Sequence, residues 1–264
     1  MDRLKSAVAP GDGRDATLRR DRMLAVGGLS AVVLLSWLYL WLRASGMDHA
    51  AMDMAPVPRA ASAGAFALTF MMWSIMMAAM MLPSAAPAIL LYGALVRKNI
   101  ADGKALPAVL RFVAGYLIVW TAFSLAATVL QTALEHAALL TPDMATASTR
   151  IGALALITAG VYQLTPLKAA CLGTCRNPLQ FFITRWRDGR HGALRMGLEH
   201  GAYCVGCCWA LMLLLFVAGV MNLVWVALIT AFVFIEKVLP GARAVTLGAS
   251  AALIASGLIL LTRI

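Results

Sequence analysis

Charged residues are scarce in this chain. They make up only 13% of its 264 residues, whereas in a soluble domain they make up about a quarter. Hydrophobic residues account for 62% of the sequence, and the mean hydropathy is +0.83. This balance excludes an ordinary soluble domain and predicts a protein that lies in a lipid bilayer.

The signatures of nucleophilic and nucleotide-dependent enzymes are also missing. The sequence has no Gly-x-Ser-x-Gly nucleophile elbow and no phosphate-binding loop. No acidic pair has the spacing of a hydrolase site, and the "GLEHG" stretch has one histidine too few for a His-Glu-x-x-His zinc helix. We therefore lean away from an enzyme, and any pumping would need an ion gradient or a partner.

Long hydrophobic runs dominate what is present. Crossing a hydrocarbon core of about 30 Å takes about 20 helical residues. We expect an all-α, polytopic membrane bundle of about seven transmembrane helices, forming one domain over residues 24–264 after a flexible basic cytoplasmic tail at 1–23. Pro83 and Pro87 should kink the second helix. The predicted spans lie at about residues 24–42, 66–95, 108–131, 150–168, 198–219, 221–239 and 244–262.

The basic residues predict how this bundle is oriented. With the N-terminus in the cytoplasm, eighteen of the 22 Lys and Arg residues fall on the inner side and four on the outer side. We therefore expect an N-in, C-out protein of a bacterial inner (plasma) membrane. The basic residues are scattered over four inner segments, so the net charge of +10 indicates topology and argues against nucleic-acid binding.

The five cysteines form two groups, and the expected topology places both toward the cytoplasm, where thiols are normally reduced. The larger group belongs to "GLEHGAYCVGCCW" (197–209). A helix places one histidine and three cysteines of this segment within about 100° of one face. Imidazole and thiolate bind Zn²⁺ or Cu⁺, and sulfur favours the softer ion. The candidate metal ligands here are His200, Cys204, Cys207 and Cys208.

Cys171 and Cys175 form the smaller group and are further ligand candidates. They share a helical face if the fourth helix persists this far, whereas Gly173 and Pro178 favour a loop equally well. For every cysteine, the competing interpretation is a small buried hydrophobic side chain. The spacing alone does not show whether the two groups meet.

Three further side chains are candidates for supporting the metal ligands. Glu199 and Tyr203 flank the His/Cys face, and Glu236 lies near the inner end of a neighbouring helix. A carboxylate there could orient His200 or accept a proton when the ligands deprotonate. The alternative for Glu236 is an ion pair with the adjacent Lys237, whose ammonium would reach the inner surface.

Methionine is concentrated in "MMWSIMMAAMM" (71–81), which holds six of the fifteen methionines. At about 100° per residue, five of them and Trp73 form two adjacent stripes, with Met71 outside. Thioethers select soft ions such as Cu⁺ and need not lose a proton, and adaptable packing is the competing interpretation. The candidate metal ligands in these stripes are Met72, Met76, Met77 and Met80.

An outer segment, "GMDHAAMDM" (46–54), adds methionine and histidine beside carboxylates. These donors could capture copper outside the membrane, and an ordinary solvated loop is the alternative. The order of donors, from this loop through the methionine stripes to the inner cysteines, would favour inward passage of Cu⁺.

Three segments resemble those of an uncharacterised bacterial family of predicted metal-binding integral membrane proteins, a domain of unknown function. The resemblance covers about residues 65–240 and implies membrane location and metal binding. It implies no established reaction and no set of ligands. The segments that carry it are "MMWSIMMAAMMLPSAAP", "GLEHGAYCVGCCW" and "FIEKVLPG".

The leading hypothesis is a membrane protein that binds a soft transition metal and moves it across the inner membrane or hands it on. Copper(I) is the favoured ion and zinc the alternative. The expected surroundings are the lipid bilayer and either a metal chaperone or another membrane subunit. One alternative function is a membrane thiol-disulfide oxidoreductase using the two cysteine groups. Another is an accessory or scaffold subunit with a structural metal site.

Overall fold

The computed structural model describes residues 12–53, 63–99, 105–141, 145–189, 191–239, 241 and 243–263, and only the backbone course of 12–22, 46–53 and 98–99. The expected all-α class is confirmed over these residues, which form helices and no strand beyond an isolated bridge between Leu140 and Thr146. The helices are α1 (Asp12–Asp53), α2 (Ala63–Asn99), α3 (Ala105–His136), α4 (Thr149–Gln163), α5 (Pro166–Arg176), α6 (Pro178–Arg185), α7 (Gly192–Leu213), α8 (Leu215–Ala218), α9 (Leu223–Val238) and α10 (Arg243–Thr262).

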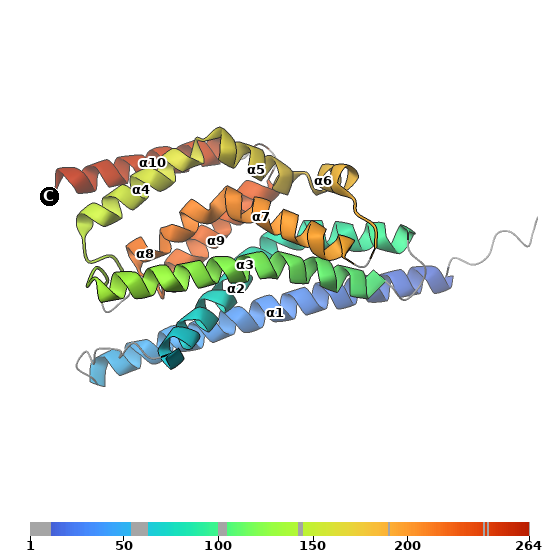
Figure 1. Ribbon diagram of the computed structural model, residues 1–264, viewed down its shortest axis with the longest axis horizontal. Coiled ribbons are helices and arrows are strands. Elements are labelled where there is room, and N and C mark those ends of the chain that lie inside the picture. The colour runs from blue at the N-terminus through green and yellow to red at the C-terminus, as the bar shows by residue number, and fades with distance from the viewer. Residues whose placement is uncertain are drawn as a thin grey trace, which may run out of the picture.

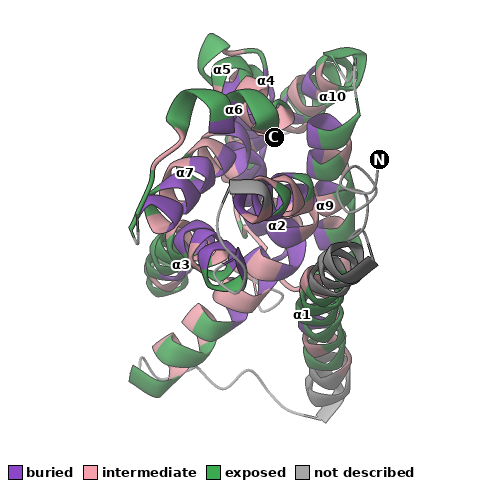
Figure 2. Cartoon of the chain, turned by 90° about the vertical axis from the view of Figure 1, so that its right-hand side faces the viewer, coloured by how far each residue is buried: buried purple, intermediate pink, exposed green. Residues whose placement is uncertain are grey.

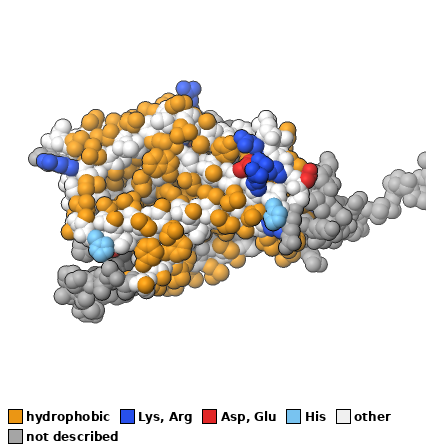
Figure 3. Space-filling view, viewed as in Figure 1, with side chains coloured by type: hydrophobic (Ala, Val, Ile, Leu, Met, Phe, Trp, Pro, Cys, Tyr) orange, Lys and Arg blue, Asp and Glu red, His pale blue; other side chains and the backbone are white. Residues whose placement is uncertain are grey.

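Within the described residues, five helical stretches are long and apolar enough to cross a membrane by length and composition. Two of the seven predicted spans contain shorter helices, because α4 has 15 residues and α9 has 16. The long helices run alongside one another in Figure 1, and hydrophobic side chains are spread over much of the face seen in Figure 3. The five stretches are Met23–Ser45, Ala63–Arg97, Ala105–His136, Gly192–Ala218 and Arg243–Thr262.

The prediction of one continuous helix over 150–168 is wrong, because the structure has two helices in this stretch. α4 ends at Gln163 and α5 begins at Pro166. Thr165 explains why a new helix begins here. Its side chain caps α5 by accepting a hydrogen bond from the backbone N–H of Lys168. Proline at the first helical position suits a helix start. The restart keeps the chain helical as far as Arg176, so the smaller cysteine group stands on a helix and not in a loop.

The ends of two other predicted segments also differ. α1 begins at Asp12, so its backbone reaches into the expected tail at 1–23, of which residues 1–11 lie outside the described part. α2 runs through Pro83 and Pro87 as one helix, and its direction changes along its length in Figure 1.

The core lies where α2, α3 and α7 face one another, whereas α1 is exposed along most of its described length (Figure 2). Glycine allows α3 and α7 to touch. A Cβ atom on Gly197 would lie 2.0 Å from the carbonyl oxygen of Phe112, and one on Gly115 would lie 2.2 Å from that of Leu194. Small residues permit such backbone contacts between membrane helices. α7, which carries the larger cysteine group, is thereby fixed against α3.

A buried ion pair ties α5 to α9. The Lys168 ammonium lies 2.7 Å from the Glu236 carboxylate, and both side chains are almost fully buried. Gln163 accepts a further hydrogen bond from Lys168, and Thr246 of α10 donates one of 2.7 Å to Glu236. The expected pairing of Glu236 with Lys237 is therefore wrong. Consecutive helical residues point about 100° apart, so the two side chains face different neighbours.

Candidate metal centre

α7 buries its histidine and all three of its cysteines. Each of the four side chains is at most 3% exposed. They do not point at one spot, however, because α7 is surrounded and each thiol meets a different neighbouring helix. The side chains in question are His200, Cys204, Cys207 and Cys208.

Cys204 lies where three other helices converge on α7. Its Sγ atom is 3.1 Å from the hydroxyl of Tyr116 on α3 and 2.9 Å from the Nζ atom of Lys237 on α9. The same ammonium donates a 3.1 Å hydrogen bond to the hydroxyl of Ser84 on α2. All four side chains are buried, so a cation and a thiol face each other out of reach of solvent.

Cys208 faces the methionine-rich helix. Its Sγ atom is 3.9 Å from the Sδ atom of Met81 on α2. It also donates a 3.0 Å hydrogen bond to the backbone carbonyl of Cys204, whose side chain lies one helical turn earlier on the same face of α7. Two thiols and one thioether thus gather between α2 and α7.

Cys207 faces α5, and through it the two cysteine groups meet. The Cys175 and Cys207 side chains lie close enough to interact. Cys171 lies against the α7 backbone, since a Cβ atom on Gly206 would be 2.8 Å from its Sγ atom. Glycine at this position leaves room for the Cys171 thiol. The sequence could not decide whether the groups meet, because the answer depends on how α5 packs on α7.

His200 sits in an aromatic environment one helical turn before Cys204. Its ring centroid is 5.3 Å from that of Phe181, 5.9 Å from that of Phe112 and 6.1 Å from that of Tyr116. Its buried Nδ1 atom has no hydrogen-bond partner in the part of the chain that the structure describes. A neutral imidazole nitrogen left in this state is available to a metal ion.

The three expected supporting residues make other contacts. Glu199 forms an ion pair of 2.8 Å with Arg187. The hydroxyl of Tyr203 accepts a 3.0 Å hydrogen bond from Arg185, and Glu236 pairs with Lys168 as described above. Among the described residues, no hydrogen bond joins any of the three to His200.

The methionine stripes of α2 face the core, as their spacing predicts. Met72 is 4% exposed and the other four methionines of the two stripes are fully buried, whereas Met71 is 45% exposed. Trp73, on the same face, donates a 2.7 Å hydrogen bond to Gln131 of α3. Met81 contacts Cys208, and sequence reasoning placed Met81 in a stripe but not among the ligands.

Sequence reasoning also missed the polar neighbours of the thiols. Lys237 was expected at the inner surface, and Tyr116 and Ser84 were given no role. Ser84 follows Met81 by three residues and so shares its helical face, which is a signal that could have been used. Nothing in the sequence indicated that Tyr116 would reach Cys204, because that contact depends on the α3–α7 crossing.

Over the described residues, no three His, Cys, Asp or Glu side chains are grouped so as to hold a metal ion. What the structure brings together is a sulfur set, the thiols of Cys204 and Cys208 with the thioether of Met81. Soft sulfur donors of this kind select Cu⁺. The outer donors of 46–54 lie outside the residues whose side chains are described.

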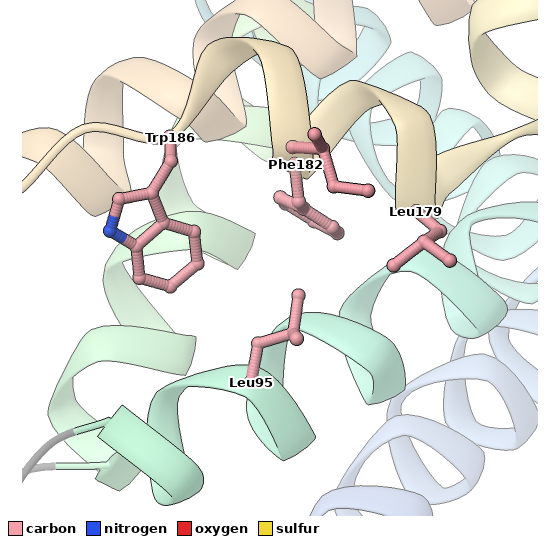
Figure 4. A pocket seen from close by; sticks show the side chains of 5 residues that line it. Leu95, Leu179, Phe182 and Trp186 are labelled. Carbon is pink, nitrogen blue, oxygen red and sulfur yellow. The ribbon is translucent and has the colours of Figure 1, made fainter.

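Two surface hollows lie apart from this sulfur set. One, of about 250 Å³, is apolar and opens between α2 and α6. Figure 4 shows Leu95 of α2 pointing toward Phe182 and Trp186 across it. The second, of about 300 Å³, is formed by α5, α6 and Tyr203 of α7. Neither is lined by a cysteine or a methionine.

No curated protein and no solved structure was found to match the chain. A protein family described as "PpoB2: Copper chaperone" matches residues 70–260, a stretch that includes the methionine stripes, both cysteine groups and Lys237. The match is consistent with the expected metal-related family, and the family's description names copper. Because the match covers most of its length, the chain belongs to the PpoB2 copper chaperone family.

Proposed function

We propose that this protein is a multi-pass membrane protein that binds copper(I) through sulfur side chains and carries it across the membrane or hands it to an acceptor. The observation that supports this most is the contact between the Cys208 thiol and the Met81 thioether beside Cys204, buried between α2 and α7. Membership of a copper chaperone family supports the choice of metal.

The proposal includes a finer membrane arrangement. The single domain over residues 24–264 crosses a bacterial inner membrane seven times, N-in and C-out, with α4 and α9 as the two short crossings. Large hydrophobic side chains are exposed on both short helices, among them Leu154, Val161, Val224 and Leu228. Such side chains on the outside of a bundle suit contact with lipid.

The donors suggest how a copper ion would move. Neutral thioethers along α2 bind Cu⁺ without deprotonation and lead to Met81, next to the cysteines. Cys204 and Cys208 bind more tightly as thiolates, and His200 can add its unpartnered Nδ1 atom. Cys207 then connects this sulfur set to Cys175 and Cys171 on α5. Copper is thus the cargo, and passage from thioether to thiolate favours inward transfer to a metal chaperone or another membrane subunit.

Metal binding by the purified full chain tests the proposal. We expect Cu⁺ to bind against a competing chelator, and Cys204→Ser to weaken this binding strongly. Met81→Leu removes one thioether at nearly constant volume, and we expect it to weaken Cu⁺ binding. The matched control is Met71→Leu on the exposed face, which should leave binding unchanged. Wild-type protein that takes up no Cu⁺ would refute the proposal.

The route through α2 is tested separately. We expect the triple substitution Met72→Leu, Met76→Leu and Met80→Leu to abolish copper accumulation in vesicles, while Cu⁺ binding at Cys204 and Cys208 persists. Unchanged uptake would show that these methionines only pack the core, and the transport part of the proposal would then fail.

One observation favours a second function, membrane thiol-disulfide exchange. The Cys175 and Cys207 thiols lie close to each other on α5 and α7, as a dithiol pair would. Trapping free thiols before and after mild oxidation separates the two functions. Reversible pairing without bound metal supports redox exchange, whereas thiol protection that a chelator removes supports copper binding.

A further inference from the structure

Lys237 is a buried cation whose charge the fold does not balance. It is 7% exposed, and no Asp or Glu lies within ion-pair distance of it among the described residues. The neighbouring Glu236 points about 100° away around α9 and is engaged by Lys168. A charge inside a membrane protein is costly and normally has a partner, so this lysine needs a source of negative charge.

Among the described residues, the groups near Lys237 that can supply that charge are thiols and a phenol. Its Nζ atom is 2.9 Å from Cys204 Sγ and 3.1 Å from Ser84 Oγ. Tyr116 reaches the same sulfur atom at 3.1 Å, and the Cys208 thiol donates a 3.0 Å hydrogen bond to the backbone carbonyl of Cys204. The cation therefore faces the sulfur set proposed to hold copper, at its first cysteine.

The charges of this set decide which ion suits it. Cys204 and Cys208 bring two negative charges as thiolates, and the Met81 thioether brings none. A monovalent ion leaves one net negative charge, which the Lys237 ammonium cancels. A divalent ion cancels both thiolates and leaves the ammonium as an unbalanced charge in a region of low dielectric constant, where such a charge is strongly disfavoured.

We propose that Lys237 is the built-in counter-charge of the sulfur set and makes it selective for a monovalent soft cation, Cu⁺, over a divalent one such as Zn²⁺. This inference rests on the proposed function. It assigns to Lys237 the choice of ion, while the binding itself belongs to the sulfur atoms.

Removing the charge tests the inference. In Lys237→Gln we expect the ratio of Cu⁺ to Zn²⁺ affinity to fall about 100-fold, because the bound monovalent ion loses its counter-charge while the divalent ion loses a repulsive neighbour. The purified full chain is titrated with each ion against a chromophoric chelator. Ag⁺ serves as a monovalent probe that does not change oxidation state. Lys237→Arg keeps the charge and should keep the preference for Cu⁺ and Ag⁺.

A second variant covers the case in which Lys237→Gln does not fold. Ser84→Asp places a carboxylate beside the ammonium and cancels its charge without removing the lysine, so the preference should shift toward Zn²⁺ in the same direction. If wild-type protein binds Cu⁺ but neither substitution shifts the ratio, the inference on Lys237 is overturned and the proposed function stands. If wild-type protein binds no Cu⁺, both are overturned.

Discussion

At the scale of single residues, the buried ion pair between Lys168 and Glu236 offers the sharpest stability test. Glu236→Gln leaves the Lys168 ammonium buried without a counter-charge, and we expect a loss of about 3 kcal/mol in unfolding free energy. Glu199→Gln is the matched control, since Glu199 pairs with partly exposed arginines and such pairs contribute about 0–1 kcal/mol. The melting temperatures of the two purified variants provide the measurement.

A double variant shows whether the missing counter-charge causes that loss. Adding Lys168→Gln to Glu236→Gln removes both charges and should restore part of the lost stability. If Glu236→Gln melts like wild type, the ion pair does not hold α5 against α9.

The same scale shows what the sequence could predict of the candidate site. The helical period alone was enough to place His200 and the three cysteines on one buried face of α7, and to separate Met71 from the other methionines of α2. The helical period does not show which side chains of other helices this face contacts. The contacts of Cys208 with Met81 and of Cys204 with Lys237 depend on how α2, α7 and α9 are rotated about their axes. That rotation is set by packing across the whole core.

At the scale of helices, the crossing of α3 and α7 determines where the sulfur set lies. Gly197→Ala places a methyl group 2.0 Å from the carbonyl oxygen of Phe112. The two helices must therefore separate, and we expect a loss of about 3 kcal/mol. Gly173→Ala makes the same change on α5, where a Cβ atom meets nothing within 4 Å. There we expect a gain of about 0.5 kcal/mol from helix propensity.

Thermal melting of both alanine variants measures these effects, and Cu⁺ titration shows whether the crossing also sets the site. The Gly197 variant should bind copper more weakly than wild type, because Tyr116 on α3 and Cys204 on α7 move apart. Equal melting temperatures for the two variants would contradict a close helix contact.

The helices also show where hydropathy misleads as a guide to boundaries. Residues 151–167 carry no charged side chain, and hydropathy alone therefore reads 150–168 as one span. The break between α4 and α5 comes from local chemistry, the Thr165 cap followed by Pro166. That chemistry determines that Cys171 and Cys175 stand on one helix and reach α7.

At the scale of the whole molecule, burial changes the meaning of some basic residues. Lys168 and Lys237 are two of the eighteen on the expected inner side, yet both are buried and bonded to neighbouring side chains. The remaining sixteen still outnumber the four outer ones, so the N-in, C-out expectation does not depend on these two. A count of charges could not separate orientation signals from internal counter-charges, because only tertiary contacts distinguish them.

The number of crossings can be tested at a single loop. With seven crossings, the segment between α6 and α7 follows four spans and lies in the cytoplasm. If only the five long stretches cross, it follows three and lies outside. The basic side chains near this loop, Arg185, Arg187 and Arg195, favour the cytoplasm.

We therefore expect a green fluorescent protein fused after residue 189 to fluoresce, and alkaline phosphatase fused there to be inactive. Fusions after residue 263 should show the reverse, because α7, α9 and α10 add three crossings. Active phosphatase at both positions would mean that α4 and α9 do not cross. Cys171 and Cys175 on α5 would then lie toward the outer side, and copper would reach the thiols from there without passing the methionines of α2.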